Sequence, residues 1–206
     1  MFSTKRFALL SLTFGVVTAG GQSRIRDEGI PKAEIAVDYS FMRANATPGK
    51  CGCFNLNGGS AEFATRAYRN LSVVADITGD HARTTSIPDQ ALSVLSYTGG
   101  PRFSYPLRHS QRSRITPFVQ GLAGVVRGFN APFPNGNGTI SSSANGLAIL
   151  VGGGVDIAIG HSLAIRALQV DYGLNHVPNN ANNTENLLRV SAGLVFRIAE
   201  HKRPQA

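Results

Sequence analysis

The segment from Glu34 to Phe41, EIAVDYSF, alternates strictly between two kinds of side chain. Its even-numbered positions carry charged or small residues, whereas its odd-numbered positions carry large apolar ones. A period of two places these sets on opposite faces of an extended chain. The segment therefore predicts a β-strand with one polar face and one apolar face.

Seven further segments repeat this alternation, and most are near the roughly 9–11 residues that a tilted transmembrane strand requires. They are 60–68, 71–78, 95–105, 115–127, 147–159, 163–174 and 188–198. In the seventh of the eight, Arg166 and Asp171 differ in parity, and a bulge at Ala167-Leu168 would return them to one face. The pattern predicts an all-β fold, an eight-stranded antiparallel up-and-down transmembrane β-barrel.

The connections between these strands alternate in length. Long polar connections follow the odd strands, at 44–58, 80–91, 128–145 and 175–186, and shorter ones follow the even strands, at 69–70, 106–114 and 160–161. Long loops at one end and short turns at the other are typical of outer-membrane barrels, with both termini periplasmic. A soluble β-sandwich, which composition alone leaves open, has little reason to show this alternation.

Composition and charge exclude one large class of function. Charged residues make up 16% of the 206 residues, below the roughly 25% of soluble domains. The formal net charge of +8 could suggest a nucleic-acid partner, but the sequence has no basic helix and no ladder of basic and aromatic residues. Nucleic-acid binding is not expected.

The N-terminus resembles a secretory signal peptide. Lys5 and Arg6 precede the apolar run 7–17, and Val17-Thr18-Ala19 fits a small-residue cleavage site. The run is shorter than the roughly 20 residues that a membrane-spanning helix needs. We expect a signal peptide at 1–19, a short periplasmic lead at 20–32, the barrel at 33–198 and a C-terminal tail at 199–206.

The polar face of the predicted strands carries charges of both signs. In a closed barrel of eight strands these side chains would fill a narrow lumen. The sequence therefore predicts an ion-pair network inside the barrel. Its predicted members are Glu34, Asp38, Glu62, Arg66, Asp76, Arg102, Asp156, Arg166, Asp171, Arg189 and Arg197.

The two cysteines stand in Cys51-Gly52-Cys53, within the first long connection. An exported chain can form a disulfide, although a single intervening residue would strain it. A metal site would require further ligands nearby, and the sequence supplies none. A disulfide that staples the loop and a pair of free thiols both remain open, and each is favoured over a redox centre.

Several segments resemble the OmpA-type outer-membrane β-barrel family, in particular its small stand-alone members. They are Gly58-Gly59-Ser60, LSVVAD at 71–76, GPRFSY at 100–105, TPFVQ at 116–120, GGGVD at 152–156, AIRALQVDY at 164–172 and RVSAGLVFR at 189–197. With the strands between them they span nearly the whole expected mature chain. Two features depart from the family: Phe196 is followed by ten more residues, and we expect no peptidoglycan-binding domain after the barrel, because the sequence stops at Ala206.

The resemblance implies an integral outer-membrane protein with a structural or surface-interaction role and a largely filled lumen. A narrow porin for small solutes is the alternative, and a rim-sited lipid-modifying enzyme ranks below it. His81 and His176 are the histidines expected at the rim, but no nucleophile motif surrounds either. We therefore expect no enzymatic activity and no catalytic, cofactor or metal-binding residues. The expected partners are outer-membrane lipid and the barrel-assembly machinery, and the expected state is a monomer; the surface partner is not identified.

Overall fold

The computed structural model describes residues 31–45, 53–83, 91–108, 114–134, 139–177 and 183–198. Nine strands lie in this part of the chain. They are β1 (Ala33–Ala44), β2 (Phe54–Tyr68), β3 (Leu71–Ala82), β4 (Leu92–Ser104), β5 (Leu107–Arg108), β6 (Arg114–Pro134), β7 (Ile140–Ala158), β8 (Leu163–His176) and β9 (Glu185–Ile198). The predicted strands all correspond to long strands here, and β5 is a two-residue addition.

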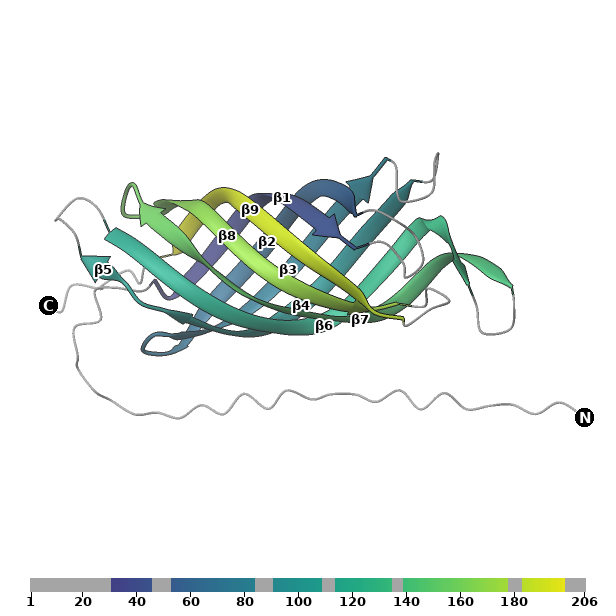
Figure 1. Cartoon of the computed structure of the whole chain (residues 1–206). Coiled ribbons are helices and arrows are strands. Elements are labelled where there is room, and N and C mark those ends of the chain that lie inside the picture. The colour runs from purple at the N-terminus through teal and green to yellow at the C-terminus, as the bar shows by residue number, and fades with distance from the viewer. Residues whose placement is uncertain are drawn as a thin grey trace, which may run out of the picture.

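The long strands form a closed barrel in which every pair of neighbours is antiparallel (Figure 1). Each long strand pairs with the next long strand along the chain, and β9 returns to pair with β1. β4 pairs directly with β6, and β5 follows β4 along the same edge of β6. Closure leaves no long edge strand exposed in the wall. The predicted all-β, eight-stranded antiparallel barrel is confirmed.

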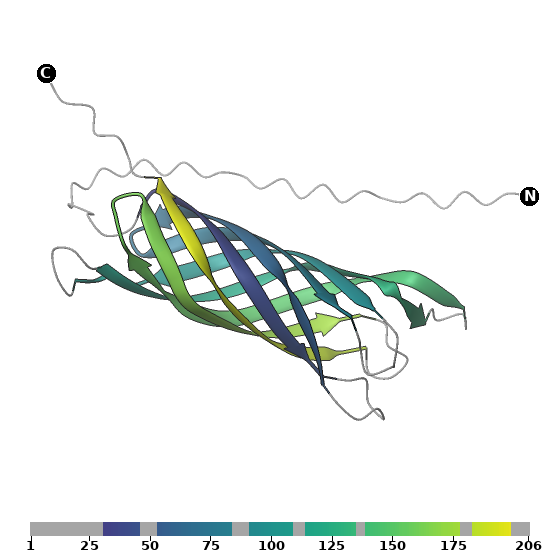
Figure 2. The same ribbon diagram turned by 90° about the horizontal axis from the view of Figure 1, so that it is seen from above.

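The two ends of the barrel differ. One end, called here the turn end, holds the Arg69-Asn70 turn, the 159–162 turn, the start of β1 and the finish of β9. The opposite end, called here the loop end, is where β1, β3, β6 and β8 finish. At the loop end β6 and β7 run well past the predicted strands 115–127 and 147–159, and their hairpin projects beyond the wall (Figure 2).

The predicted bulge in β8 is present. Asp156 pairs with Arg166 but its neighbour Val155 pairs with Leu168, so Ala167 is an extra residue against β7. The same shift appears against β9. Ala167 and Leu168 both point outward, which returns Arg166 and Asp171 to the interior, each 0% exposed. The bulge at Ala167-Leu168 is therefore confirmed.

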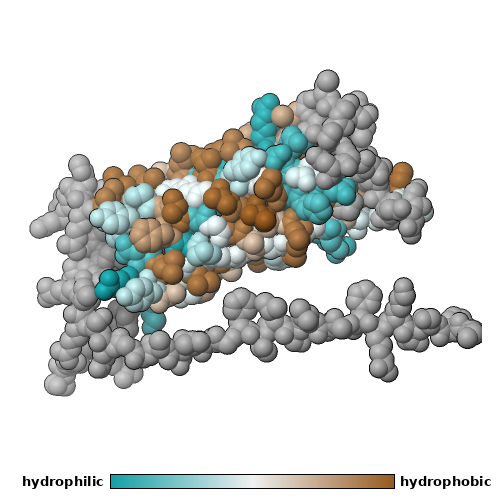
Figure 3. Space-filling model, turned by 60° about the horizontal axis from the view of Figure 1, so that its bottom comes forward, coloured by the Kyte–Doolittle hydropathy of each residue, from teal (hydrophilic) through white to brown (hydrophobic). Residues whose placement is uncertain are grey.

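The outer face is apolar over the middle of the barrel, and polar side chains gather toward its ends (Figure 3). Alternate residues of each strand supply the apolar face, such as Val37, Tyr39 and Phe41 on β1. Val151 on β7 is 61% exposed, whereas the charged residues of the opposite parity are buried. The strands thus invert the usual distribution of a soluble protein.

Within the described residues, no helix is long and apolar enough to span a membrane.

Candidate functional site in the barrel lumen

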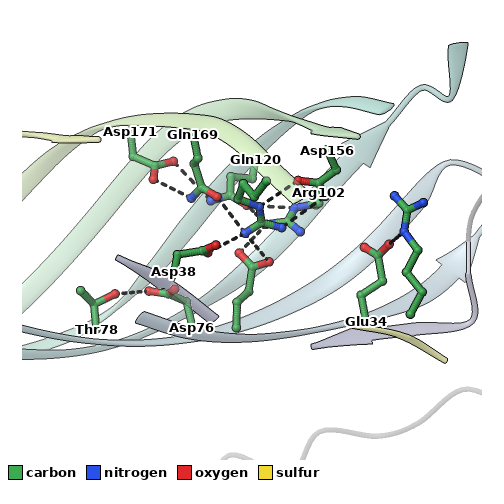
Figure 4. A network of polar contacts seen from close by, with 12 residues as sticks. Glu34, Asp38, Asp76, Thr78, Arg102, Gln120, Asp156, Gln169 and Asp171 are labelled. Carbon is green, nitrogen blue, oxygen red and sulfur yellow. Dashed lines mark hydrogen bonds and ion pairs between the residues drawn. The ribbon is translucent and has the colours of Figure 1, made fainter. Parts of the chain in front are cut away.

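One polar network crosses the lumen and takes at least one side chain from each of the eight long strands (Figure 4). Three arginines, Arg102, Arg166 and Arg189, form its centres, and each is no more than 1% exposed. Their partners point inward because they share the parity that alternates with the apolar outer face. Those partners are Asp38, Glu62, Asp76, Thr78, Gln120, Asp156, Gln169 and Asp171.

Arg166 on β8 reaches carboxylates on three other strands. Its Nη1 lies 3.1 Å from Asp38 Oδ2 on β1 and 3.1 Å from Glu62 Oε1 on β2. Its Nε donates to Asp156 Oδ1 on β7 at 3.0 Å. A guanidinium has five donors in a rigid plane, so one side chain can join several strands at once.

Arg102 on β4 extends the network to the opposite wall. It donates to Glu62 Oε2 and, through Nε, to Gln120 Oε1 at 3.0 Å. Its guanidinium carbon lies 4.1 Å from the centre of the Phe118 ring, and that of Arg166 lies 4.9 Å from the same ring. A buried aromatic face between two cations stabilises both by cation–π attraction.

Arg189 on β9 forms the third centre, nearer to the loop end. Its Nη2 lies 2.9 Å from Asp171 Oδ2 on β8, and its Nη1 lies 3.1 Å from Asp76 Oδ1 on β3. Nη1 also donates to Thr78 Oγ1 at 2.7 Å. Asp171 accepts a further bond from Gln120 Nε2 at 3.3 Å, which connects this centre to Arg102.

The remaining three predicted members lie nearer to the turn end. Arg197 Nε donates to Glu34 Oε1 at 3.2 Å, and this pair stands apart from the main network in Figure 4. Arg66 is half-buried near the turn-end terminus of β2. Eight of the eleven predicted side chains therefore form one central network, and Glu34 and Arg197 form a separate pair.

Sequence reasoning missed the uncharged members of the network. Gln120, Gln169 and Thr78 carry contacts between the charged groups, and Phe118 packs between two of the arginines. Their inward parity is visible in the sequence, but an uncharged side chain of inward parity does not by itself indicate an ion-pair network. Gln169 could be assigned to the inner face only with the bulge in place.

Asp80 is a further acidic side chain that the sequence pattern assigned to a loop. β3 continues to Ala82, so Asp80 faces the lumen and is 4% exposed. It stands opposite Ser40 across Gly58, which is paired with both residues in the sheet. With Asp80 included, three arginines of the central lumen face six carboxylates, whereas the eleven predicted residues comprise six acids and five arginines.

The predicted polar lumen gives way to an apolar layer toward the loop end. Most members of this layer stand near the loop-end termini of their strands; Met42 and Ala44 close β1, and Leu92 begins β4. Phe133 from the projecting β6–β7 hairpin packs against the layer, with its ring over Gly128. The layer consists of Met42, Ala44, Leu56, Ala82, Leu92, Leu122, Leu150 and Leu187. The same buried cluster also includes Ala64 and Val74, and the inward polar residues Asp80 and Asn175 stand near the loop end as well.

Glycines make room for the buried groups. A Cβ on Gly152 would lie 2.3 Å from Asp171 Oδ1, and one on Gly154 would lie 2.7 Å from the Phe118 ring. The run 152–154 on β7 is therefore explained by close packing inside the barrel.

The rim histidine His81 has a hydroxyl neighbour that the sequence did not identify. His81 Nδ1 lies 3.0 Å from Ser93 Oγ, and Asn130 Nδ2 donates to the same hydroxyl at 3.1 Å. A hydrolytic triad also needs an acid to orient the histidine, but the acids of the described strands have inward parity. His176 lies on the outer face of β8 and lines an open depression with Asn145 and Asn183.

Some sequence predictions fall outside the described residues. These include the signal peptide at 1–19, most of the 20–32 lead, the tail at 199–206, and Cys51. Cys53 is exposed at the start of β2. In the part of the chain that the structure describes, no group of three or more His, Cys, Asp or Glu residues could hold a metal ion.

A closed antiparallel barrel of eight long strands, apolar outside and packed with charged groups inside, is the fold of the small outer-membrane β-barrels. The resemblance to OmpA-type barrels is confirmed at the level of the fold. No protein-family model matches the chain. No curated protein sequence matches it either.

Two solved structures show the likeness. Neisserial surface protein A superposes with a TM-score of 0.56 at 17% sequence identity, over 83% of this chain and 100% of that one. Ail, the attachment invasion locus protein of Yersinia pestis, gives a TM-score of 0.50 at 13% identity, over 82% and 99% of the two chains. At these identities the likeness concerns the fold.

Proposed function

We propose that this protein is an integral outer-membrane β-barrel with a structural or surface-interaction role and a largely filled lumen. The observation that carries the proposal is the inversion of polarity between the two faces of the wall. Large apolar side chains such as Val119, Tyr172 and Phe196 are 47–60% exposed, whereas Arg166 and Asp171 are 0% exposed. Soluble monomers rarely expose an apolar patch beyond roughly 300–600 Å².

Tyrosines near both ends support a membrane-spanning orientation. At the loop end, the hydroxyls of Tyr39 and Tyr172 donate to Asn57 and Asn186 at 2.7 and 2.8 Å. At the turn end, Tyr68 and Tyr105 are exposed. Tyrosine suits a membrane–water interface because its ring is apolar and its hydroxyl is polar. By the usual arrangement of such barrels, the loop end faces outward and the turn end faces the periplasm.

The projecting hairpin supports a role at the cell surface. β6 pairs with β4 no further than Phe129, and β7 pairs with β8 only from Leu147 onward. Beyond these points, at 130–134 and 140–146, the two strands pair with each other and not with β4 or β8. The names of the two similar structures describe a surface protein and an attachment protein. We extend that class of role to this chain, without assigning it their partners.

The packing of the interior favours a structural role rather than a pore function. The polar network joins all eight long strands, and the apolar layer lies toward the loops. Water and ions would have to break charge-assisted hydrogen bonds and then pass the apolar side chains gathered toward the loops. We accordingly propose a monomeric, non-enzymatic barrel that meets outer-membrane lipid and, during biogenesis, the assembly machinery.

Cell fractionation and planar-bilayer recording test this proposal together. The full chain should co-fractionate with the outer membrane and migrate differently on gels before and after heating, as folded barrels do. In a bilayer it should conduct little or only rarely. Recovery in the soluble fraction would refute the membrane assignment, whereas steady ohmic current would replace the filled barrel with a narrow porin.

A further inference from the structure

The outward-facing residues change character at one level near the loop end. On β1 the apolar series ends at Phe41 and continues with Arg43; on β6 it ends at Val125 and continues with Arg127. The outward-facing residues of β2, β3, β7 and β8 make the same change. We call the resulting ring of exposed polar residues the outer collar; it comprises Arg43, Asn55, Asn57, His81, Arg83, Arg127, Asn145 and His176.

The collar carries cations without acids. Its basic residues stand on β1, β3, β6 and β8, the four strands that finish at the loop end. The eight acidic residues of the described strands all have the inward parity, so none joins the collar. Among the described strands, no carboxylate of the outer face therefore competes with an anionic partner for these cations.

The segment of the collar between β1 and β3 is the densest. Arg43 pairs with Asn55, and Asn57 pairs with His81, so two asparagines separate the basic side chains of the flanking strands. Two strand spacings place β1 and β3 roughly 10 Å apart. Arg83 follows His81 by two positions and has the same outward parity. One guanidinium group can donate two parallel hydrogen bonds to the oxygens of a phosphate, and the asparagine amides can donate further bonds.

We propose that Arg43, Arg83 and the residues between them bind the phosphate groups of lipid headgroups in the leaflet at the loop end. The inference rests on the proposed function, since only a membrane-inserted barrel holds the collar at that level. The level of the collar along the barrel favours lipid over a protein partner. The apolar residues directly below it contact acyl chains, so the collar lies where headgroups begin. A surface protein would meet the loops and the β6–β7 hairpin above it.

Titration of the purified full chain in neutral detergent micelles with bisphosphorylated lipid A tests the proposal. The double variant Arg43→Gln/Arg83→Gln should weaken binding about thirtyfold, as loss of two cations near an anionic headgroup predicts. The matched control, Lys32→Gln/Arg69→Gln, removes two exposed cations at the turn end and should leave the affinity within about twofold. Dephosphorylated lipid A should bind the wild type as weakly as the phosphorylated form binds the collar variant.

Equal losses in the two double variants would overturn the proposal, because they would indicate attraction to net charge alone. Displacement of lipid A by millimolar inorganic phosphate would overturn it in favour of a free-anion site. Heat-modifiable gel mobility is recorded for every variant beforehand. A folded, membrane-inserted barrel without selective lipid A binding refutes only the collar site, whereas a chain that does not insert refutes the proposed function.

Discussion

Arg166 Nη1 lies 3.1 Å from Asp38 Oδ2, although 128 positions separate the two residues in the chain. Arg166 is on β8 and Asp38 is on β1, with β9 between them in the wall. Their contact passes across the inside of the barrel, so it forms only after β9 has closed the sheet onto β1. The ion pair is a tertiary contact that stabilises closure.

Loss of the buried arginines should both destabilise and open the barrel. In Arg102→Ala/Arg166→Ala, Glu62, Asp38 and Asp156 lose their cationic partners. Removing one partner of a buried pair costs about 3–5 kcal/mol, because the other charge stays buried without compensation. Thermal unfolding should therefore shift to lower temperature, and single-channel recording should show more conductance than in the wild type. A wet lumen with solvated charges would instead give appreciable wild-type current and a small loss of stability.

The two faces of β7 should respond differently to substitution. Val151→Arg places a charge on the outer face, where the cost at the bilayer midplane is about 2–4 kcal/mol. Asp156→Asn keeps the size of an inward side chain that accepts bonds from Arg166. Heat-modifiable mobility after folding into lipid should show greater damage to insertion in Val151→Arg. Similar damage in both variants would mean that the faces are assigned wrongly.

Close packing over the glycines of β7 gives a third prediction. In Gly152→Ala the new Cβ would lie 2.2 Å from the Val170 carbonyl oxygen, so the wall must shift. Overpacking of this kind costs about 1–3 kcal/mol. Gly121→Ala is the matched control, because nothing lies within 4 Å of its Cβ position. Denaturant unfolding should show a lower free energy of unfolding for Gly152→Ala only. Equal stabilities of the two variants would contradict the packing described at Gly152.

The expected signal peptide predicts the N-terminus of the mature protein. If cleavage follows Val17-Thr18-Ala19, the membrane-purified protein begins at Gly20. N-terminal sequencing of the outer-membrane fraction measures this directly. Recovery of a chain that still begins at Met1 in that fraction would refute cleavage at this site.

Alternation with a period of two was enough to predict much of the barrel. It identified all eight long strands and assigned outward and inward faces to residues such as Val151 and Asp156. It also located the bulge at Ala167-Leu168, because Arg166 and Asp171 could share a face in no other way. Strand ends at the loop side were predicted less well. There β6 and β7 extend beyond the lipid level, where no apolar face marks the strand.

The sequence by itself determined the strand number and the side of the wall on which each residue lies, because pleating turns successive side chains to opposite faces whatever the partner strand. It did not determine which inward groups meet. Barrel closure, register and tilt bring Arg166 to Asp38 and Glu62, surround Arg189 with Asp76 and Asp171, and collect the apolar layer near the loops. Those contacts depend on the relative shift of strands far apart in the chain, and hydrogen-bond register fixes that shift only when the sheet is closed.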